Sequence, residues 1–538
     1  MIFTLRQIPV SAFEIAPLRR AAAVRKQVNS HSKARLAVCR KVLALFLVAA
    51  VPGLRAQSPS GPIQLPASGR ALQSGSVNTT QSTLNAGGQI SVNLIDSSVN
   101  IQGPYQGSVP TGTDTKTVIV LSLQEALRLA LNLNLGVVSA TEGMRQARAQ
   151  RLAFLSQLLP NVNGGFRETV EQTDLVALGL RPSIFPGIPS VIGPYNYFDF
   201  RATLTQTVAD LTRLHNLRAA AEDMRAAEFT ARDARDLVVL AVTGSYLQVI
   251  AAGSRVRAAE AAVRTSEATY QQATDQLRNG LNARIDVIRS QVQLQTDRQR
   301  LRGLRADFET QELTLARVIG LPAGQAFSLS DAFTFSPLAD LTQEDALARA
   351  KAARADIMAA QAAVRAGEEA LKAARSQYLP SVSVEADYGV IGTNPSQSHG
   401  TFGMTGSVAF PIWQGHKIKA DIEQAQSVLS QRSAEYADLL GQVDFEVRRE
   451  FIDLAAAADQ VSLAQNNAGL AADTLRQSQD RFKAGVADTV EVVQAQQTVE
   501  QADNDLISAT YEHNLAKAAL ARALGRAEQT IPQYLKGK

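Results

Sequence analysis

The sequence predicts a mainly α-helical protein that also carries a transmembrane β-barrel. Three features of the 538 residues support this fold class. One unit is written twice along the chain, long stretches are rich in Ala, Gln, Leu and Arg, and segments that alternate apolar and polar residues follow an export signal. Only 5% of the chain is aromatic, a composition that favours long helices over a compact enzyme.

The first 56 residues are predicted to be a signal peptide and leader. A basic stretch leads into Lys41 and the apolar run 42–51, which is too short to span a bilayer. Without residues 1–56 the formal charge changes from +4 to −5 (44 basic and 49 acidic residues), so no nucleic-acid surface is expected. The single cysteine, Cys39, precedes the apolar run, so neither a lipid anchor nor a disulfide is expected.

Residues 57–118 are rich in Ser, Gly, Asn, Gln and Thr and lack helical periodicity. They are predicted to be mostly disordered or wrapped around the helices, and strand pairing within 89–102 is left open. The expected organisation of the rest is a first repeat at 119–320, a connector in an equatorial belt at 321–341, a second repeat at 342–526, and a C-terminal tail in the same belt at 527–538.

Each repeat is predicted to open with a helix. The stretches 122–125 and 342–345 resemble a capping box and a close variant, and they lie 220 positions apart. Each helix should end before a Leu-Pro, at Pro160 and Pro380, because proline cannot continue the hydrogen-bond ladder. These prolines are again 220 positions apart.

The segments after these prolines are predicted to be β-hairpins. Apolar and polar residues alternate in 381–390, in 401–410 and in 198–205, while Glu168 interrupts the apolar face of 161–172. Four strands cannot close a barrel, but three copies of the chain would supply twelve. Such a barrel would turn its apolar face to lipid and its polar face to a water-filled lumen.

Two very long helices follow the hairpins, from about residue 211 to 278 and from about 416 to 483. At 1.5 Å per residue each would span on the order of 100 Å. Such helices can pair as coiled coils, so a soluble periplasmic coiled-coil scaffold is the alternative interpretation. That alternative leaves the apolar faces of the hairpins without a partner.

Each long helix is predicted to end at a glycine, where the match between the repeats shifts to 205 positions. The stretch "DQLRNGLNARIDVIRSQ" (275–291) matches "DRFKAGVADTVEVVQAQ" (480–496), which pairs Gly280 with Gly485. Glycine permits the tight reversal that joins two antiparallel helices.

In order and spacing, residues 120–526 resemble the TolC-like outer-membrane efflux proteins. The resemblance implies a homotrimer with a 12-stranded barrel in the outer membrane and an α-helical barrel that extends into the periplasm. Such a protein would be the passive exit duct of a tripartite efflux or type I secretion system and would need no cofactor. Its partners would be a periplasmic adaptor (membrane fusion) protein, an inner-membrane pump of RND, ABC or MFS type, and outer-membrane lipid.

The same resemblance implies roles for residues at the two glycine turns. Gly280 and Gly485 would form periplasmic tips where the adaptor docks, and the acids there would line a gate: Asp286, Asp488 and Glu491. The alternative interpretation of Asp286 and Glu491 is a solvated charge at a helix start, where the helix dipole favours an acid.

Other positions depart from the family pattern or mark the membrane. Phe482, Ala487 and Gln494 replace residues typical of the family, so its gate-locking bonds are not carried over. Trp413 is expected to lie at the membrane interface, with packing between strand and helix as the alternative.

The sequence contains no pattern typical of an enzyme. The five histidines are scattered without ligand spacing, so no metal site is expected, and neither a phosphate-binding loop nor a nucleophile elbow occurs. An enzyme with a hidden site is therefore the least supported hypothesis, after the outer-membrane duct and the soluble scaffold.

Overall fold

The computed structural model describes residues 63–66, 68, 74–82, 94–113, 115, 117–180, 187–281, 283–332, 334–338 and 341–536. The chain divides into two units, Met1–Ser60 and Gly61–Lys538, and every described residue lies in the second. The predicted signal peptide and leader therefore lie outside the described residues.

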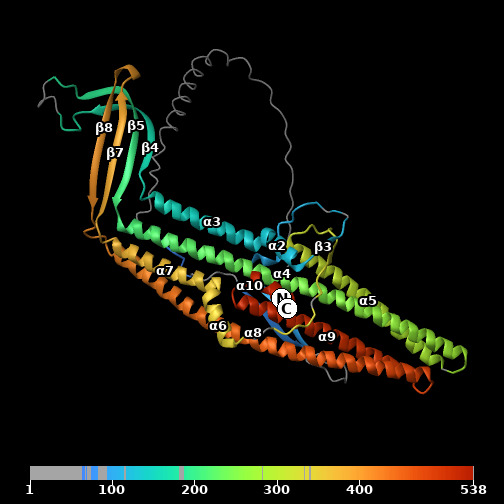
Figure 1. Cartoon of the computed structure of the whole chain (residues 1–538). Helices are drawn as coiled ribbons and strands as arrows, with labels where there is room; N and C mark the ends of the chain where they lie inside the picture. The colour runs from blue at the N-terminus through green and yellow to red at the C-terminus, as the bar shows by residue number, and fades with distance from the viewer. Residues whose placement is uncertain are drawn as a thin grey trace, which may run out of the picture. The chain divides into compact units, whose positions relative to one another are not determined.

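The described residues of the second unit form long helices, one four-stranded sheet and two two-stranded sheets (Figure 1). Its elements in chain order are β1 Ser74–Ser82, β2 Leu94–Gln102, η1 Pro104–Gln106, β3 Ile119–Leu121, α2 Leu123–Leu133, α3 Leu135–Ser156, β4 Asn161–Asp174, β5 Val191–Ala209, α4 Leu211–Arg278, α5 Arg284–Ile319, β6 Phe327–Leu329, α6 Gln343–Ala353, α7 Ala355–Ser376, β7 Ser381–Gly392, η2 Pro395–Gln397, β8 Ser398–Ala409, α8 Lys417–Lys483, α9 Thr489–Ala523 and α10 Ala527–Lys536.

The four strands predicted after the Leu-Pro positions form one antiparallel sheet in the order β4-β5-β7-β8. The register places apolar side chains of neighbouring strands opposite one another, for example Phe166 with Phe200 and Tyr388 with Phe402. Because successive strand residues point to opposite faces, this arrangement creates one apolar and one polar face.

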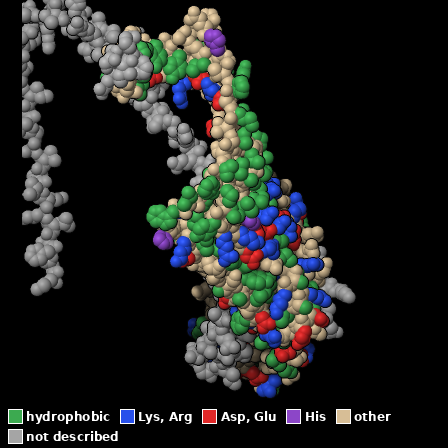
Figure 2. Space-filling view, turned by 90° about the vertical axis from the view of Figure 1, so that its left-hand side faces the viewer, with side chains coloured by type: hydrophobic (Ala, Val, Ile, Leu, Met, Phe, Trp, Pro, Cys, Tyr) green, Lys and Arg blue, Asp and Glu red, His purple; other side chains and the backbone are tan. Residues whose placement is uncertain are grey.

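The apolar face of this sheet is exposed. Its large side chains have no covering element in the described chain and include Val162, Phe166, Phe200, Tyr388, Phe402, Met404 and Val408. Figure 2 shows hydrophobic side chains along the sheet and over the neighbouring ends of the helices, with charged side chains more frequent farther along the helices. An apolar face of this extent requires lipid or another protein surface.

The predicted helix starts are confirmed, but each predicted single helix is in fact two. The hydroxyl groups of Ser122 and Thr342 cap the backbone N–H groups of Glu125 and Asp345, each at 3.2 Å. The chain then breaks at Asn134, between α2 and α3, and at Arg354, between α6 and α7. Both residues have an extended backbone conformation, with ψ angles of 132° at Asn134 and 126° at Arg354.

The two predicted long helices are confirmed at almost the expected residues, as α4 and α8. α4 contains an apolar stretch that is long enough to cross a membrane by length and composition alone, but 72% of that stretch is buried within the protein. Its side chains, such as Leu237 and Tyr246, belong to the main hydrophobic core together with residues of α2, α5 and α9. The stretch is therefore a core segment.

Segments outside the repeats pack around the middle of these helices. β1 and β2 form an antiparallel hairpin, which the Arg449 side chain ties to α8 through the Val77 carbonyl at 3.1 Å. In the connector, β6 pairs in parallel with β3. In the C-terminal tail, α10 contributes Ile531 and Leu535 to the main core. Part of 57–118 therefore wraps the helices, as one of the two interpretations predicted.

Neighbouring helices line up side by side in two rows, one beside the sheet and one toward the other end of the unit, and we call each row a helical layer. Beside the sheet, α3 packs on α4, α4 on α7 and α7 on α8; toward the other end the neighbours are α5 with α4, α4 with α9 and α9 with α8 (Figure 1). The outer members of the described chain are thus α3 and α5 on one side and α8 on the other. The outer helices α5 and α8 expose large apolar side chains: Ile288, Val292, Leu313, Phe445, Ile452, Leu463 and Leu470.

Candidate functional site

The two glycine turns have the geometry that tight helix reversals require. Gly280 and Gly485 both have φ 72°, in the left-handed region that favours glycine. After α4, the N–H of Leu281 donates to the Gln276 carbonyl at 2.9 Å, and after α8 the N–H of Val486 donates to the Arg481 carbonyl at 3.0 Å. These bonds define the same helix-ending motif in both repeats.

The two tips end side by side, at the end of the helices opposite the sheet (Figure 1). Ala273 of α4, Phe482 of α8 and Val492 of α9 form a small buried cluster. The Gln276 side chain also donates to the Phe482 carbonyl at 3.2 Å. Phe482, one of the departures from the family pattern, is therefore a packing residue that joins the two tips.

Asp286 and Glu491 lie in the first turns of α5 and α9, and Asp488 is the capping residue before α9. Asp286 pairs with Arg289 at 3.3 Å, and its side chain is only 13% exposed. Glu491 pairs with Arg481 at 3.3 Å, and the Asp488 carboxylate caps α9 by accepting the Glu491 N–H at 3.0 Å. Each acid thus has a local partner at a helix N-terminus, where the dipole also favours it.

The two tips differ in their helix caps. Ala283 occupies the capping position before α5 but provides no side-chain cap, whereas its counterpart Asp488 caps α9. We expect Ala283→Ser to stabilise the first turn of α5 by about 1 kcal/mol, which corresponds to roughly fivefold slower amide exchange there. Hydrogen exchange followed by mass spectrometry would measure it, with Asp488→Ala as the matched loss of a cap. Unchanged exchange over 284–288 in Ala283→Ser would contradict the prediction.

Above the tips, polar contacts join the first helix pair to the second. Gln496 of α9 donates to Thr269 of α4 at 2.9 Å, and Gln497 donates to Gln293 of α5 at 3.3 Å. Arg300 of α5 also forms an ion pair with a carboxylate of α9, Glu500. Sequence reasoning did not select these residues, because polar residues on long helices usually face solvent.

At the opposite end of α8, Trp413 lies in the segment that joins β8 to the helix. Its side chain is 81% exposed, and Phe410 and Ile412 beside it are also exposed. Within the described chain the tryptophan is therefore not packed between strand and helix. Exposed aromatic residues next to an apolar sheet edge are typical of a membrane interface.

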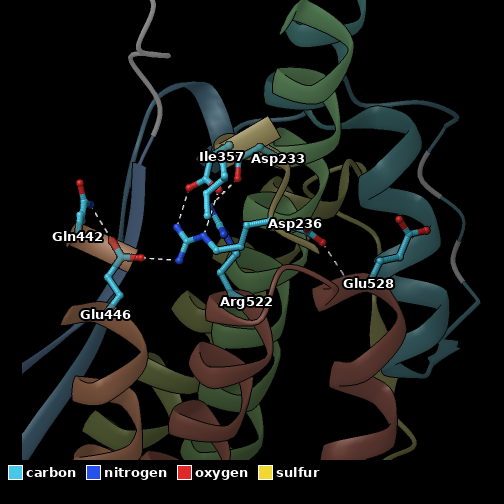
Figure 3. Close-up of polar contacts among 9 residues, drawn as sticks. Asp233, Asp236, Ile357, Gln442, Glu446, Arg522 and Glu528 are labelled. Atoms are coloured by element: carbon cyan, nitrogen blue, oxygen red, sulfur yellow. Dashed lines mark hydrogen bonds and ion pairs between the residues drawn. The ribbon is translucent and has the colours of Figure 1, made fainter. Parts of the chain in front are cut away.

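A buried cluster of charges lies between the sheet and the tips, where the two repeats meet. Figure 3 shows Arg522 of α9 directed at Asp233 of α4, a pair separated by 2.6 Å. Arg354, at the α6–α7 break, pairs with Asp356 at 2.6 Å and with Glu446 of α8 at 2.7 Å. These pairs connect α4, α7, α8 and α9.

Burial acts to raise the pKa values of two acids in this cluster, Asp356 and Asp236, and a nearby arginine acts to lower them. Burial raises the pKa of Asp356, but the hydrogen bond and charge of Arg354 outweigh it and hold this pKa at about 2. For Asp236, burial dominates and raises the pKa, although the charge of Arg522 opposes the change. Sequence analysis missed Arg354, although its counterpart 220 positions earlier, Asn134, is also polar. The Asn134 side chain stabilises the first break by accepting a hydrogen bond from the Gly136 N–H.

A buried carboxyl on α8 predicts a pH-dependent stability. Burial raises the pKa of Glu450 from 4.5 to about 8, and the charges of Asp453 and Glu446 add to this effect while Arg449 opposes it. Because the folded chain holds the proton more tightly, we expect stability to fall as the pH rises from 4.5 to about 8. Glu450→Gln should reduce this fall in thermal melts followed across that range. The exposed Glu423→Gln on the same helix serves as the control, and an equal pH dependence in both variants would contradict the assignment.

Comparison with known proteins places the chain in a family. The model of the outer membrane efflux protein family matches residues 126–321 and 346–526, which is more than half of the chain. The pyoverdine export outer membrane protein OpmQ of Pseudomonas putida is 22% identical over 75% of this chain and 85% of its own. The outer membrane efflux protein BepC of Brucella suis is 27% identical over 63% of this chain and 77% of its own.

Solved structures show the same fold. The outer membrane protein VceC of Vibrio cholerae has a TM-score of 0.63 and 17% identity, over 75% of this chain and 96% of that one. The CmeC outer membrane channel of Campylobacter jejuni has a TM-score of 0.66 and 16% identity, over 84% of this chain and 95% of that one. With the duplicated hairpins and paired tips, these matches establish that the chain belongs to the outer membrane efflux protein family, as an outer-membrane channel that extends into the periplasm.

Proposed function

We propose that three copies of this chain close head to tail into one passive exit duct. The observation that carries this proposal is the set of unmatched outer elements. The sheet ends in β4 and β8, and the helical layers end in α3 and α5 on one side and in α8 on the other. In every layer one outer element therefore comes from the first repeat and the other from the second.

A head-to-tail contact repeated by rotation closes into a ring, and ring closure removes the free sheet edges. Three copies would supply twelve strands, an even number that suits an outer-membrane barrel. The exposed apolar side chains of α8 would then pack against α5 of the next copy. The soluble scaffold is not favoured, because the apolar sheet face would remain in water.

Single-particle electron microscopy of the mature chain in detergent tests this assembly. The expected result is a threefold tube with a barrel at one end and a helical tunnel at the other. A soluble monomer, or a ring with another number of copies, would contradict the proposal.

The tips are the proposed contact with the rest of the export system. A periplasmic adaptor protein would dock there, and an inner-membrane pump of RND, ABC or MFS type would supply the energy, so the duct itself would need no catalytic site. The acids Asp286, Asp488 and Glu491 would line the narrow end. Relatives are named for pyoverdine export and for cation efflux, which fits a duct whose cargo is selected mainly by the pump.

Exposed apolar side chains at the tips predict where the adaptor binds. Leu281 and Val486 lie directly after the two glycines, and both are exposed. We expect Leu281→Asp combined with Val486→Asp to abolish adaptor cross-linking while trimers persist, because a buried charge is costly in an apolar contact. Leu178→Asp, in the exposed loop between β4 and β5, is the matched control. Undiminished cross-linking in the tip variant would argue against docking at the tips.

A further inference from the structure

The polar face of the sheet carries a charged cluster that neither the helical tips nor the family match explains. At its centre is Arg201 of β5, whose register partners are Gly165 of β4 and Gly389 of β7. A Cβ atom on Gly389 would come within 3.0 Å of the Arg201 Cα and Cβ atoms. Gly389 therefore lets β7 approach β5 closely at Arg201, whereas a Cβ atom on Gly165 would meet nothing within 4 Å.

The arginine contacts three strands. Its Nε donates to Asp199 at 3.2 Å, its Nη1 pairs with Asp387 of β7, and its Nη2 donates to the Thr401 hydroxyl of β8 at 3.2 Å. The aspartate also depends on a glycine, because a Cβ on Gly403 would lie 2.7 Å from the Asp387 Oδ1 atom. The cluster thus spans the junction between the first and the second repeat.

The charges of the cluster do not cancel. One guanidinium faces two carboxylates, all of them about a quarter exposed, so each copy carries a net charge of −1 at this depth. Arg167 and Glu385 lie on the same face, as the register partner of Asp199 and two residues before Asp387, and their opposite charges leave the sum unchanged. In a threefold barrel the cluster would form a ring of net charge −3.

We propose that this ring is a cation-selective element of the barrel lumen, and that Arg201 sets its strength by neutralising one of the two acids. A ring of carboxylates in a water-filled pore raises the local concentration of cations and repels anions. The proposal rests on the proposed threefold duct, because only closure turns the polar face into a lumen. It assigns a selectivity role to the barrel in addition to the acids at the tips.

Reversal potentials in planar lipid bilayers test this role. The full-length mature protein would be purified as a trimer and measured across a potassium chloride gradient. Arg201→Gln changes the ring from −3 to −6 and should shift the reversal potential toward that of potassium, whereas Asp387→Asn brings it to 0 and should shift it toward that of chloride. Arg201→Lys keeps the charge and should behave as the wild type.

A second acid variant and the assembly state of the wild-type protein distinguish failure of the ring from failure of the duct. Asp199→Asn repeats the loss of one acid without touching β7, so it replaces Asp387→Asn if that variant fails to assemble. Conducting trimers whose reversal potential is the same in Arg201→Gln, Asp199→Asn and the wild type would overturn the proposal and leave the duct intact. A wild-type protein that forms no threefold conducting tube would overturn the assembly and the ring together.

Discussion

Replacing Arg522 by methionine is expected to lower the free energy of unfolding by about 3–5 kcal/mol, because it removes the cation from a buried ion pair. The Arg522 and Asp233 side chains are 9% and 5% exposed, and their charged atoms lie 2.6 Å apart. Methionine fills most of the arginine volume, so the loss would arise from the buried carboxylate rather than from a cavity. The charge of Arg522 also lowers the pKa of Asp236, which should therefore rise further in the variant.

The measurement is a thermal melt of the purified protein, followed by circular dichroism. Arg526→Met, at an exposed position beyond α9, is the control for loss of an arginine. Combining Arg522→Met with Asp233→Asn should recover part of the loss, since a coupled pair makes the double variant less destabilised than the sum of the single variants. A loss below about 1 kcal/mol in Arg522→Met, the range of an exposed ion pair, would contradict a structural role for the pair.

The second large effect is expected when an arginine is placed on the apolar face of the sheet. Phe200 lies in the middle of β5, between Phe166 of β4 and Val390 of β7, and its side chain is 59% exposed. If this face meets lipid, Phe200→Arg should cost about 2–4 kcal/mol near the bilayer midplane, because the charge must leave water. The expected result is a strong loss of heat-resistant barrel in outer-membrane fractions.

Two variants separate this effect from simple loss of packing. Phe200→Leu keeps an apolar side chain and should assemble normally. Thr203→Arg places the same charge on the opposite face of the same strand, beside Asp387, where a water-filled lumen should accept it. Equal losses in Phe200→Arg and Thr203→Arg would show that the two faces do not differ in environment.

The repeats made much of this fold predictable. Matching capping stretches and Leu-Pro positions marked the same elements in both repeats, and the alternation of the strands identified which face is apolar. The positive φ of Gly280 and Gly485 followed from the same comparison. These features depend on local backbone preferences and on side-chain periodicity, which a sequence displays directly.

The buried contacts could not be predicted in this way. The breaks at Asn134 and Arg354 lie inside helical patterns, and the partners that stabilise them are far away in sequence: Arg354 pairs with Glu446, 92 positions later, and Asn134 donates to the Val318 carbonyl, 184 positions later. Likewise, alternation placed Arg201 on the polar face without indicating that it joins three strands. Such pairs exist only once the chain has brought distant elements together.

The sequence by itself determined the duplication and order of the main elements of the two repeats, the extent of the two longest helices, the two faces of the hairpins and the glycine reversals, because each leaves a local pattern that can be compared between the repeats. Only the tertiary structure decided which charges are buried together, that both tips end side by side, and that the outer elements of the sheet and of the helical layers lie on matching sides. Those properties depend on contacts between distant residues, whose free energy reflects burial and geometry that local patterns do not encode.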